Sequence, residues 1–146
     1  MTGEPRLRRA TAADETRLRE IAEASKGHWG FEPERMRAWA ASLDLAREIW
    51  VVEREGRIVA WAAVLPPQDG SCELDDLWVE PASIGSGVGR ILFEHTAARA
   101  RELGARSLHW EAEPNAVGFY ERMGAATVGS ATSSWGREIP VMEVAL

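Results

Sequence analysis

The chain alternates between stretches in which apolar residues recur at every second position and stretches in which they recur at every third or fourth position. The second spacing is typical of amphipathic helices, and residues 36–43, which follow Pro33, are the clearest example. The first spacing is typical of half-buried strands, and the dipeptide Glu55-Gly56 separates two such strands as a hairpin turn. The pattern therefore predicts a chain that mixes strands and helices.

The elements can be placed along the whole chain. The predicted strands cover residues 5–10, 49–53, 57–64, 72–79, 106–112, 126–132 and 138–145. The predicted helices begin after a Thr11–Asp14 capping pair, at Pro33, at residue 87 and after Pro114, with a loop expected at residues 26–32. The order β-α-α-β-β-β-α-β-α-β-β predicts an α/β fold, in which a mixed, partly antiparallel sheet of about six to seven strands is flanked by about four helices. We expect a single domain over residues 1–146, with a parallel strand–helix–strand crossover at 73–112.

Composition narrows the class of protein. The 146 residues are 45% hydrophobic and 27% charged, which is typical of a soluble globular protein. The net charge of −6 and the isoelectric point near 5.1 argue against nucleic acid or an anionic membrane as the main partner, and are compatible with a cationic amine. No stretch is apolar enough to span a bilayer, so we expect a cytoplasmic protein. Cys72 is the only cysteine, and His28, His95 and His109 are not closely spaced, so neither a disulfide nor a metal site is expected.

Three glycines at alternate positions, Gly85, Gly87 and Gly89, follow a strand and a proline and lead into a helix. Glycine lets the backbone approach a ligand closely, and the N–H groups at a helix start attract phosphate. A P-loop would continue with lysine and then serine or threonine, whereas here arginine follows Gly89. A dinucleotide fingerprint would need glycine at position 90 and a tighter turn than residues 80–84 allow. A pyrophosphate site for coenzyme A is the third interpretation.

Four segments follow one another along the chain: LDDLWVEP, IGSGVGR, ARELGA and PNAVGFYERMGA. Their order and spacing resemble the GNAT superfamily of acetyl-CoA-dependent N-acetyltransferases, from about residue 6 to residue 146. In one departure, Ile84 stands where the family loop often carries Gln or Arg, which is expected to weaken phosphate binding slightly because backbone N–H groups do most of that work. The resemblance implies an enzyme that moves an acetyl group from acetyl-CoA to a primary amine by direct nucleophilic attack.

The resemblance also implies which residues hold the cofactor. The main chain of Leu77, Trp78 and Val79 would pair with the pantetheine amides. The pyrophosphate would lie on a segment that we call the glycine loop, formed by Gly85, Ser86, Gly87, Val88, Gly89 and Arg90. Asn115 and Phe119 would add contacts. Alternatives stay open: Leu77 and Val79 can be plain core residues, Arg90 a surface charge and Asn115 a helix cap.

Tyr120 matches the position at which family members often place a tyrosine that protonates the departing thiolate, and packing beside Phe119 is its alternative role. A carboxylate base is expected on the strand 72–79, where Glu73 and Asp75 share one face. Glu73 matches a position where some family members carry the base, and Asp75 or water is the alternative; a bulge would change which side chains share a face. Candidates for contacts with the acceptor are Trp29 and Asp75, with His28, Trp135 and Arg137 as further ones.

The expected protein is therefore an acetyl-CoA-dependent enzyme whose acceptor is a small amine or a peptide N-terminus. A CoA-binding regulatory module without catalysis is the alternative, and a dinucleotide-dependent enzyme is a more distant one. The sequence leaves open which amine is acetylated, whether other acyl groups are used, and whether two copies pair through an edge strand as a homodimer.

Overall fold

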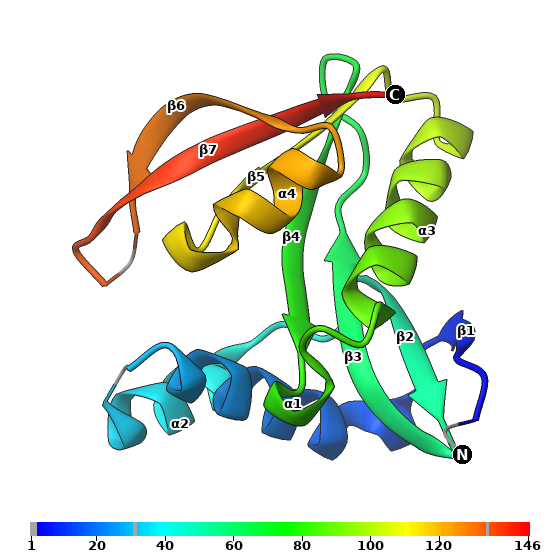
Figure 1. The fold of residues 1–146 in the computed structure, drawn as a ribbon, viewed down its shortest axis with the longest axis vertical. Helices are drawn as coiled ribbons and strands as arrows, with labels where there is room; N and C mark the ends of the chain where they lie inside the picture. Colours follow the sequence, from blue (N-terminus) through cyan, green and yellow to red (C-terminus); the bar gives the residue numbers. More distant parts are fainter. Residues whose placement is uncertain (1–2, 31, 134) are drawn as a thin grey trace. The chain divides into compact units, whose positions relative to one another are not determined.

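The computed structural model describes residues 3–30, 32–133 and 135–146. Its strands form a mixed sheet in the order β1-β2-β3-β4-β5-β7-β6 (Figure 1). The strands are β1 (Arg6–Arg9), β2 (Glu48–Arg54), β3 (Arg57–Val64), β4 (Ser71–Val79), β5 (Ser107–Glu111), β6 (Ala126–Thr132) and β7 (Glu138–Ala145). The helices are α1 (Glu15–His28), α2 (Pro33–Ser42), α3 (Val88–Glu102) and α4 (Val117–Arg122), with 3₁₀ turns η1 (Ala12–Asp14), η2 (Pro81–Ser83) and η3 (Pro114–Ala116). The predicted α/β fold with a mixed sheet and four helices is confirmed over the described residues.

The connections explain the strand directions. Glu55 and Gly56 have φ angles of 52° and 76°, the left-handed pair that suits a two-residue hairpin turn between β2 and β3. β4 and β5 are parallel, as predicted for a crossover through α3. β7 is antiparallel to both β5 and β6 and lies between them. The last hairpin joins the sheet through its second strand because β7 buries Met142 opposite Trp110, whereas β6 is exposed along almost its whole length.

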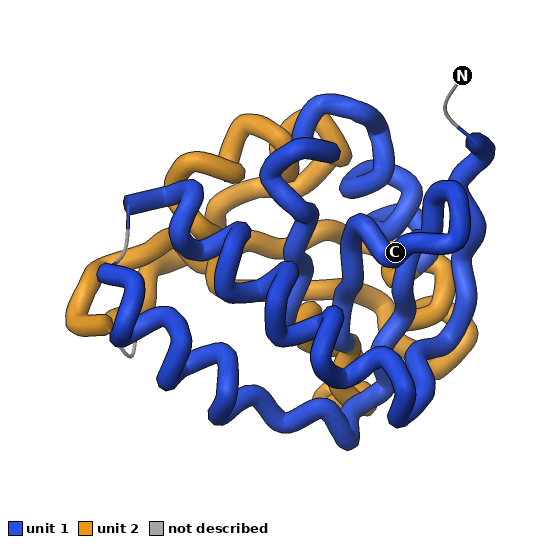
Figure 2. Tube along the Cα trace, turned by 90° about the horizontal axis from the view of Figure 1, so that it is seen from below, with its two compact units in different colours: residues 1–63, 76–95 blue, residues 64–75, 96–146 orange. Residues whose placement is uncertain are grey.

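The chain forms two compact units, which Figure 2 colours separately. Unit 1 consists of Met1–Ala63 and Asp76–His95, and it includes α1, α2, the end of β4 and the first half of α3. Unit 2 consists of Val64–Asp75 and Thr96–Leu146, and it includes the start of β4 and every element from β5 onward. The single domain over residues 1–146 stays a prediction. Within the described residues, no helix is long and apolar enough to cross a lipid bilayer.

The core of unit 1 lies between α1 and the strands β2 and β3. Leu18, Ile21 and Ala22 stand at helical spacing on α1 and are buried. They pack with Trp61 of β3, which is fully buried and whose Nε1 donates a hydrogen bond to the carbonyl of Leu18 at 2.9 Å. Because the indole N–H has a partner, the largest side chain of this core carries no unsatisfied donor.

The core of unit 2 lies under α4. Trp110 of β5 is buried, and its ring centroid lies 4.8 Å from that of Tyr120 on α4. Leu108 and Met142 are also fully buried. Cys72 is buried, as expected of a small core residue.

The prediction of a loop at residues 26–32 is wrong for its first part. α1 continues to His28, and the chain turns at Gly30, where φ is 89°. Gly27 lies inside the helix, at a place where an added Cβ would come 3.3 Å from Cε of Met36 on α2. Gly27 therefore makes room for the side chain of Met36 instead of ending the helix. Residue 31 of this segment lies outside the described residues.

Candidate functional site

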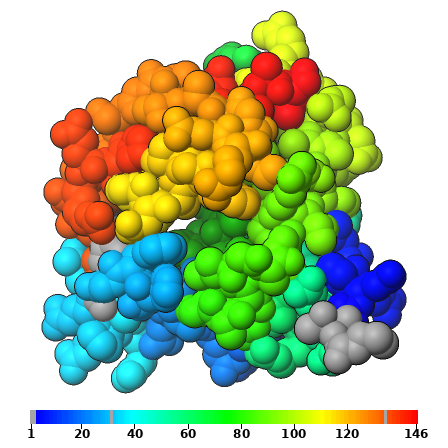
Figure 3. Space-filling model, in the orientation of Figure 1, coloured from blue at the N-terminus to red at the C-terminus, as the bar shows by residue number. Residues whose placement is uncertain are grey.

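The glycine loop belongs to unit 1 and leads into α3, and its green atoms lie on the face of the molecule shown in Figure 3. Gly85 and Gly87 have φ angles of 85° and 93°, and an added Cβ would meet nothing within 4 Å at either position. The first helical hydrogen bond runs from Ile91 N–H to the carbonyl of Gly87 at 3.2 Å, so helix geometry leaves the N–H groups just before Ile91 without an intrahelical acceptor. These open N–H groups beside two left-handed glycines fit a phosphate group.

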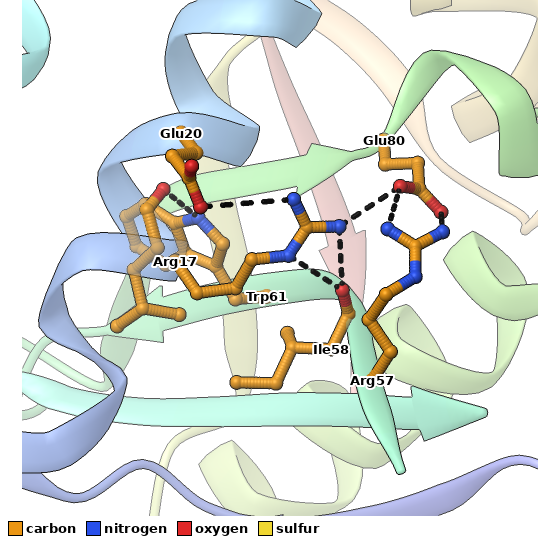
Figure 4. Close-up of polar contacts among 7 residues, drawn as sticks. Arg17, Glu20, Arg57, Ile58, Trp61 and Glu80 are labelled. Atoms are coloured by element: carbon orange, nitrogen blue, oxygen red, sulfur yellow. Dashed lines mark hydrogen bonds and ion pairs between the residues drawn. The ribbon is translucent and has the colours of Figure 1, made fainter. Parts of the chain in front are cut away.

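Glu80 anchors the segment that leads into the glycine loop (Figure 4). Its carboxylate accepts hydrogen bonds from Arg17 Nη2 at 2.8 Å and from the two Nη atoms of Arg57 at 2.7 and 2.8 Å. Ser83 Oγ adds a bond at 2.9 Å, and Glu80 N–H donates to the carbonyl of Val59 at 2.8 Å. Burial alone would raise the pKa of Glu80, but the bonds from Arg57, Ser83 and Arg17 outweigh burial and lower the pKa. Sequence reasoning missed Glu80, because Arg17 is 63 residues away along the chain.

Arg90 lies on the exposed surface of α3. Its Nε donates to Glu94 Oε1 at 2.8 Å, and the two side chains are 69% and 57% exposed. An exposed pair at this helical spacing contributes only about 0.3–0.5 kcal/mol. The pair with Glu94 agrees with the alternative that Arg90 is a surface charge. A role of Arg90 in phosphate binding stays a prediction.

The end of β4 carries the residues expected to face the pantetheine. Leu77, Trp78 and Val79 are partly buried. The ring of Trp78 lies 5.2 Å from that of Trp39, and its Nε1 donates to Asp76 Oδ1 at 2.8 Å. The side chain of Trp78 thus packs on the core of unit 1, and a cofactor contact would fall to its main chain, as the resemblance implies. Residues 77–79 as cofactor contacts stay a prediction.

Tyr120 is buried in unit 2, with its ring centroid 4.8 Å from Trp110 and 5.1 Å from Phe119. Burial raises the pKa of the Tyr120 phenol above its usual range. The phenol therefore stays protonated at neutral pH. Tyr120 has the core packing that sequence reasoning gave as its alternative role, and its part as an acid stays a prediction.

Asn115 lies in η3, just before α4. Its Nδ2 donates to Glu113 Oε1 at 2.8 Å on the exposed surface, and α4 has no side-chain cap. The capping alternative for Asn115 is wrong, because the residue at the N-cap of α4 is Ala116 and no side chain caps this helix. Its contact with the cofactor stays a prediction.

Glu73 on β4 stands opposite His109 on β5, in the last residue pair of the parallel ladder. Glu73 Oε1 lies 3.8 Å from His109 Nε2, and Ser71 Oγ lies 2.7 Å from His109 Nδ1. Leu74, the next residue, is buried, so the predicted alternation along the strand holds here. The sequence did not predict that His109 lies beside Glu73, because the register of two parallel strands cannot be derived from the residues of either strand alone.

The remaining candidates lie in different units. Asp75 is exposed on β4, whereas the neighbouring Asp76 is held by Arg47 Nη1 at 2.6 Å. Trp29 caps the end of α1, with its ring centroid 4.6 Å from that of His28. Their contacts with an acceptor stay predictions. In the part of the chain that the structure describes, no group of three or more His, Cys, Asp or Glu side chains could hold a metal ion.

Comparison with known proteins defines the family. The family model described as "Acetyltransferase (GNAT) family" matches residues 15–125, which is most of the chain. The chain therefore belongs to the GNAT acetyltransferase family, whose members use acetyl-CoA.

Individual relatives agree with this assignment. The chain is 36% identical to peptidyl-lysine N-acetyltransferase YjaB of Escherichia coli K12 over 73 residues, which cover 49% of this chain and 48% of that protein. Its fold is similar to that of a GCN5-related N-acetyltransferase from Rhodopseudomonas palustris, with 23% identity, a TM-score of 0.82 and coverage of 100% and 98% of the two chains. It is also similar to PaiA N-acetyltransferase from Thermoplasma acidophilum, solved with coenzyme A, with 15% identity, a TM-score of 0.78 and coverage of 98% and 99%. The matches span 48% to 64% of the length of the curated relatives.

Proposed function

We propose that this protein is an N-acetyltransferase that moves an acetyl group from acetyl-CoA to a primary amine. The observation that carries the proposal is the glycine loop, with left-handed Gly85 and Gly87 and open N–H groups at the start of α3, in a chain of the GNAT family. Successive backbone N–H groups in such a turn bind anions without needing a particular side chain. When bound, the cofactor supplies an acetyl group activated as a thioester.

The cofactor contacts are proposed to come mostly from the main chain. The glycine loop would take the pyrophosphate, and the backbone of residues 77–79 would take the pantetheine amides. Among the described residues, the ladder between β4 and β5 covers Ser71, Cys72 and Glu73, while β4 itself runs on to Val79. Asn115 and Phe119, on either side of the start of α4, are proposed as additional contacts.

Two groups of unit 2 are proposed to handle protons. Tyr120 Oη would donate a proton toward the departing sulfur, and its buried phenol keeps that proton at neutral pH. The carboxylate of Glu73 would accept the proton that the amine must lose, with Asp75 or water as the alternative. The side chain of Glu73 is 43% exposed, so an acceptor or a water molecule can reach it.

The acceptor is proposed to be a lysine side chain, with a peptide N-terminus or a small amine as further candidates. The Escherichia coli relative is named for peptidyl-lysine, and a relative from Oryza sativa for serotonin; both names denote primary amines. A net charge of −6 favours the approach of a cationic amine. Trp29 and Asp75 are proposed to contact this acceptor.

The test begins with thermal unfolding at saturating acetyl-CoA, with NADH and ATP as controls. Ligand at about 100 times its dissociation constant stabilises by about 2.7 kcal/mol, which for a chain of this size raises the midpoint by roughly 5–10 °C. Release of free thiol is then followed with a lysine-containing peptide and a panel of amines. Turnover supports the proposal. A shift without turnover on any amine supports a CoA-binding module instead, and no shift with acetyl-CoA overturns both.

A further inference from the structure

Polar side chains form a row across three strands of unit 2. His109 of β5 is paired with Glu73 of β4 on one side and with Glu143 of β7 on the other. Residues directly opposite each other in neighbouring strands project to the same face of a sheet. Ser71, two residues before Glu73, shares that face. The imidazole of His109 is therefore flanked by a carboxylate from each neighbouring strand.

The two ring nitrogens of His109 have different neighbours. Nδ1 lies 2.7 Å from Ser71 Oγ, and Nε2 lies 3.8 Å from Glu73 Oε1. In the tautomer whose Nδ1–H donates to Ser71 Oγ, the lone pair of Nε2 faces the Glu73 carboxyl. The side chains of His109 and Glu73 are 37% and 43% exposed, so one water molecule or a small rotation closes the remaining gap.

We propose that His109 is a positioning residue that acts through Glu73, by taking over the proton that Glu73 removes from the acceptor amine. An N–H bond of the amine breaks and an O–H bond forms on Glu73. That O–H bond then breaks as an N–H bond forms at His109 Nε2. The ring gives up its Nδ1 proton to Ser71 Oγ, and the Ser71 hydroxyl passes its own proton to water. This inference rests on the proposed function.

This series of proton transfers, which we call the relay, reduces the difference in basicity between Glu73 and the amine. A carboxylic acid has a pKa near 4.3 in water, an imidazolium near 6.5 and an alkylammonium near 10.4, so a lone carboxylate is a very weak base toward an ammonium group. Passing the proton on to an imidazole makes its transfer from the ammonium group about two pKa units less unfavourable than transfer to a lone carboxylate. The ring contacts Glu73 and Ser71, and the charged residues on the same face of the sheet are Glu143, opposite His109 on β7, and Glu111, two residues further along β5.

The first test is the pH profile of kcat/KM with acetyl-CoA and a lysine peptide. His109→Gln keeps a polar side chain but cannot hold the relayed proton. We expect it to lower kcat/KM for the peptide at least about tenfold near pH 7, to move the acidic limb of the profile to lower pH because only the weaker base Glu73 is left, and to leave KM for acetyl-CoA unchanged. Imidazole added to His109→Ala should restore part of the rate. A variant that keeps the height and shape of the wild-type profile overturns the relay.

A second measurement needs no turnover. The ring of His109 is titrated by NMR in the free protein, in Glu73→Gln and in Glu143→Gln, which remove one flanking carboxylate each. We expect Glu73→Gln to change the titration of the ring by more than Glu143→Gln does, because Glu73 Oε1 lies 3.8 Å from His109 Nε2. Equal shifts, or none, overturn the link between His109 and Glu73. Lack of turnover in the wild type would overturn the proposed function, while this titration still decides whether the two side chains are coupled.

Discussion

At the scale of single residues, the burial of Tyr120 determines what its hydroxyl can do. Tyr120→Phe keeps the ring that packs on Trp110 and removes only the proposed proton donor. We expect kcat to fall at least about tenfold, because a positioned acid contributes this much or more. The stabilisation by acetyl-CoA should not change. Steady-state kinetics combined with thermal unfolding checks both expectations, and an unchanged kcat would remove Tyr120 from proton transfer.

A second residue-scale feature is the charged contact between Asp14 and Arg8. The Asp14 carboxylate accepts hydrogen bonds from Arg8 Nη1 and Nη2 at 2.8 and 2.9 Å, and from Thr11 N–H at 2.7 Å. The bonds from Arg8 lower the pKa of Asp14 from 3.8 to about 2, against the effect of burial. Because the folded pKa lies below the unfolded one, the stabilisation is fully present above about pH 4 and is lost as the pH falls through about 2.

Asp14→Asn should therefore lower the free energy of unfolding at pH 7 by roughly 1–2 kcal/mol, a value reduced by water around the part-exposed Arg8. The gap between variant and wild type should narrow between pH 4 and pH 2. Urea unfolding at pH 7, 4 and 2.5 measures the gap, and Glu4→Gln, at an exposed carboxylate, is the control. A difference in unfolding free energy that stays constant with pH would contradict the stabilisation by ionised Asp14.

At the scale of elements, α3 has a left-handed glycine at each end. Gly87 and Gly104 share a φ of 93°, and an added Cβ would meet nothing within 4 Å at either place. Gly87→Ala and Gly104→Ala should thus strain the backbone alike, by about 1–2 kcal/mol. We expect only Gly87→Ala to raise the dissociation constant for acetyl-CoA, by at least about tenfold, because only Gly87 lies at the N–H end of the helix. Calorimetric titration measures the dissociation constant for acetyl-CoA in both variants. Equal dissociation constants in Gly87→Ala and Gly104→Ala would contradict a phosphate site at the start of α3.

Glu80 connects α1, β3 and the start of the glycine loop. In Glu80→Ala, Arg17 and Arg57 lose the carboxylate that they share. We expect a loss of about 1–3 kcal/mol in stability and weaker binding of acetyl-CoA, because the glycine loop is no longer tied at its start. Glu94→Ala, which removes the exposed partner of Arg90, should leave stability almost unchanged and serves as the control. Equal losses in the two variants would show that Glu80 anchors nothing.

At the scale of the whole molecule, the net charge of −6 should act on the acceptor. Raising the salt concentration screens charges that are more than about a Debye length apart. We therefore expect KM for an arginine-flanked lysine peptide to rise several-fold between about 0.05 and 0.5 M NaCl, since steering of this kind weakens with ionic strength. A lysine peptide with neutral flanks is the control. The same KM increase for both peptides would show that long-range charge does not select the acceptor.

Much of this molecule was determined by local sequence. Periodic apolar residues specified each helix and strand, because burying one face requires spacings that differ between the two structures. Glu55 and Gly56 specified a hairpin, because that turn needs two left-handed residues. The left-handed turn of the glycine loop was predictable for the same reason, since Gly85 and Gly87 are close together in the chain. The local prediction failed at Gly27, which lies inside α1 and not in a loop. In the sequence, a glycine that makes room for a neighbouring side chain cannot be distinguished from one that ends a helix.

Only the tertiary structure decided which distant residues meet. The placement of β7 between β5 and β6, the two arginines on Glu80 and the position of His109 opposite Glu73 all join segments far apart in the chain. Each depends on the register and order of strands, and these follow from packing over a whole face and not from any short pattern. The sequence by itself therefore determined the elements, the family and the glycine loop at the start of α3. The fold decided which side chain stands beside the proposed base, because that neighbour is supplied by a different strand.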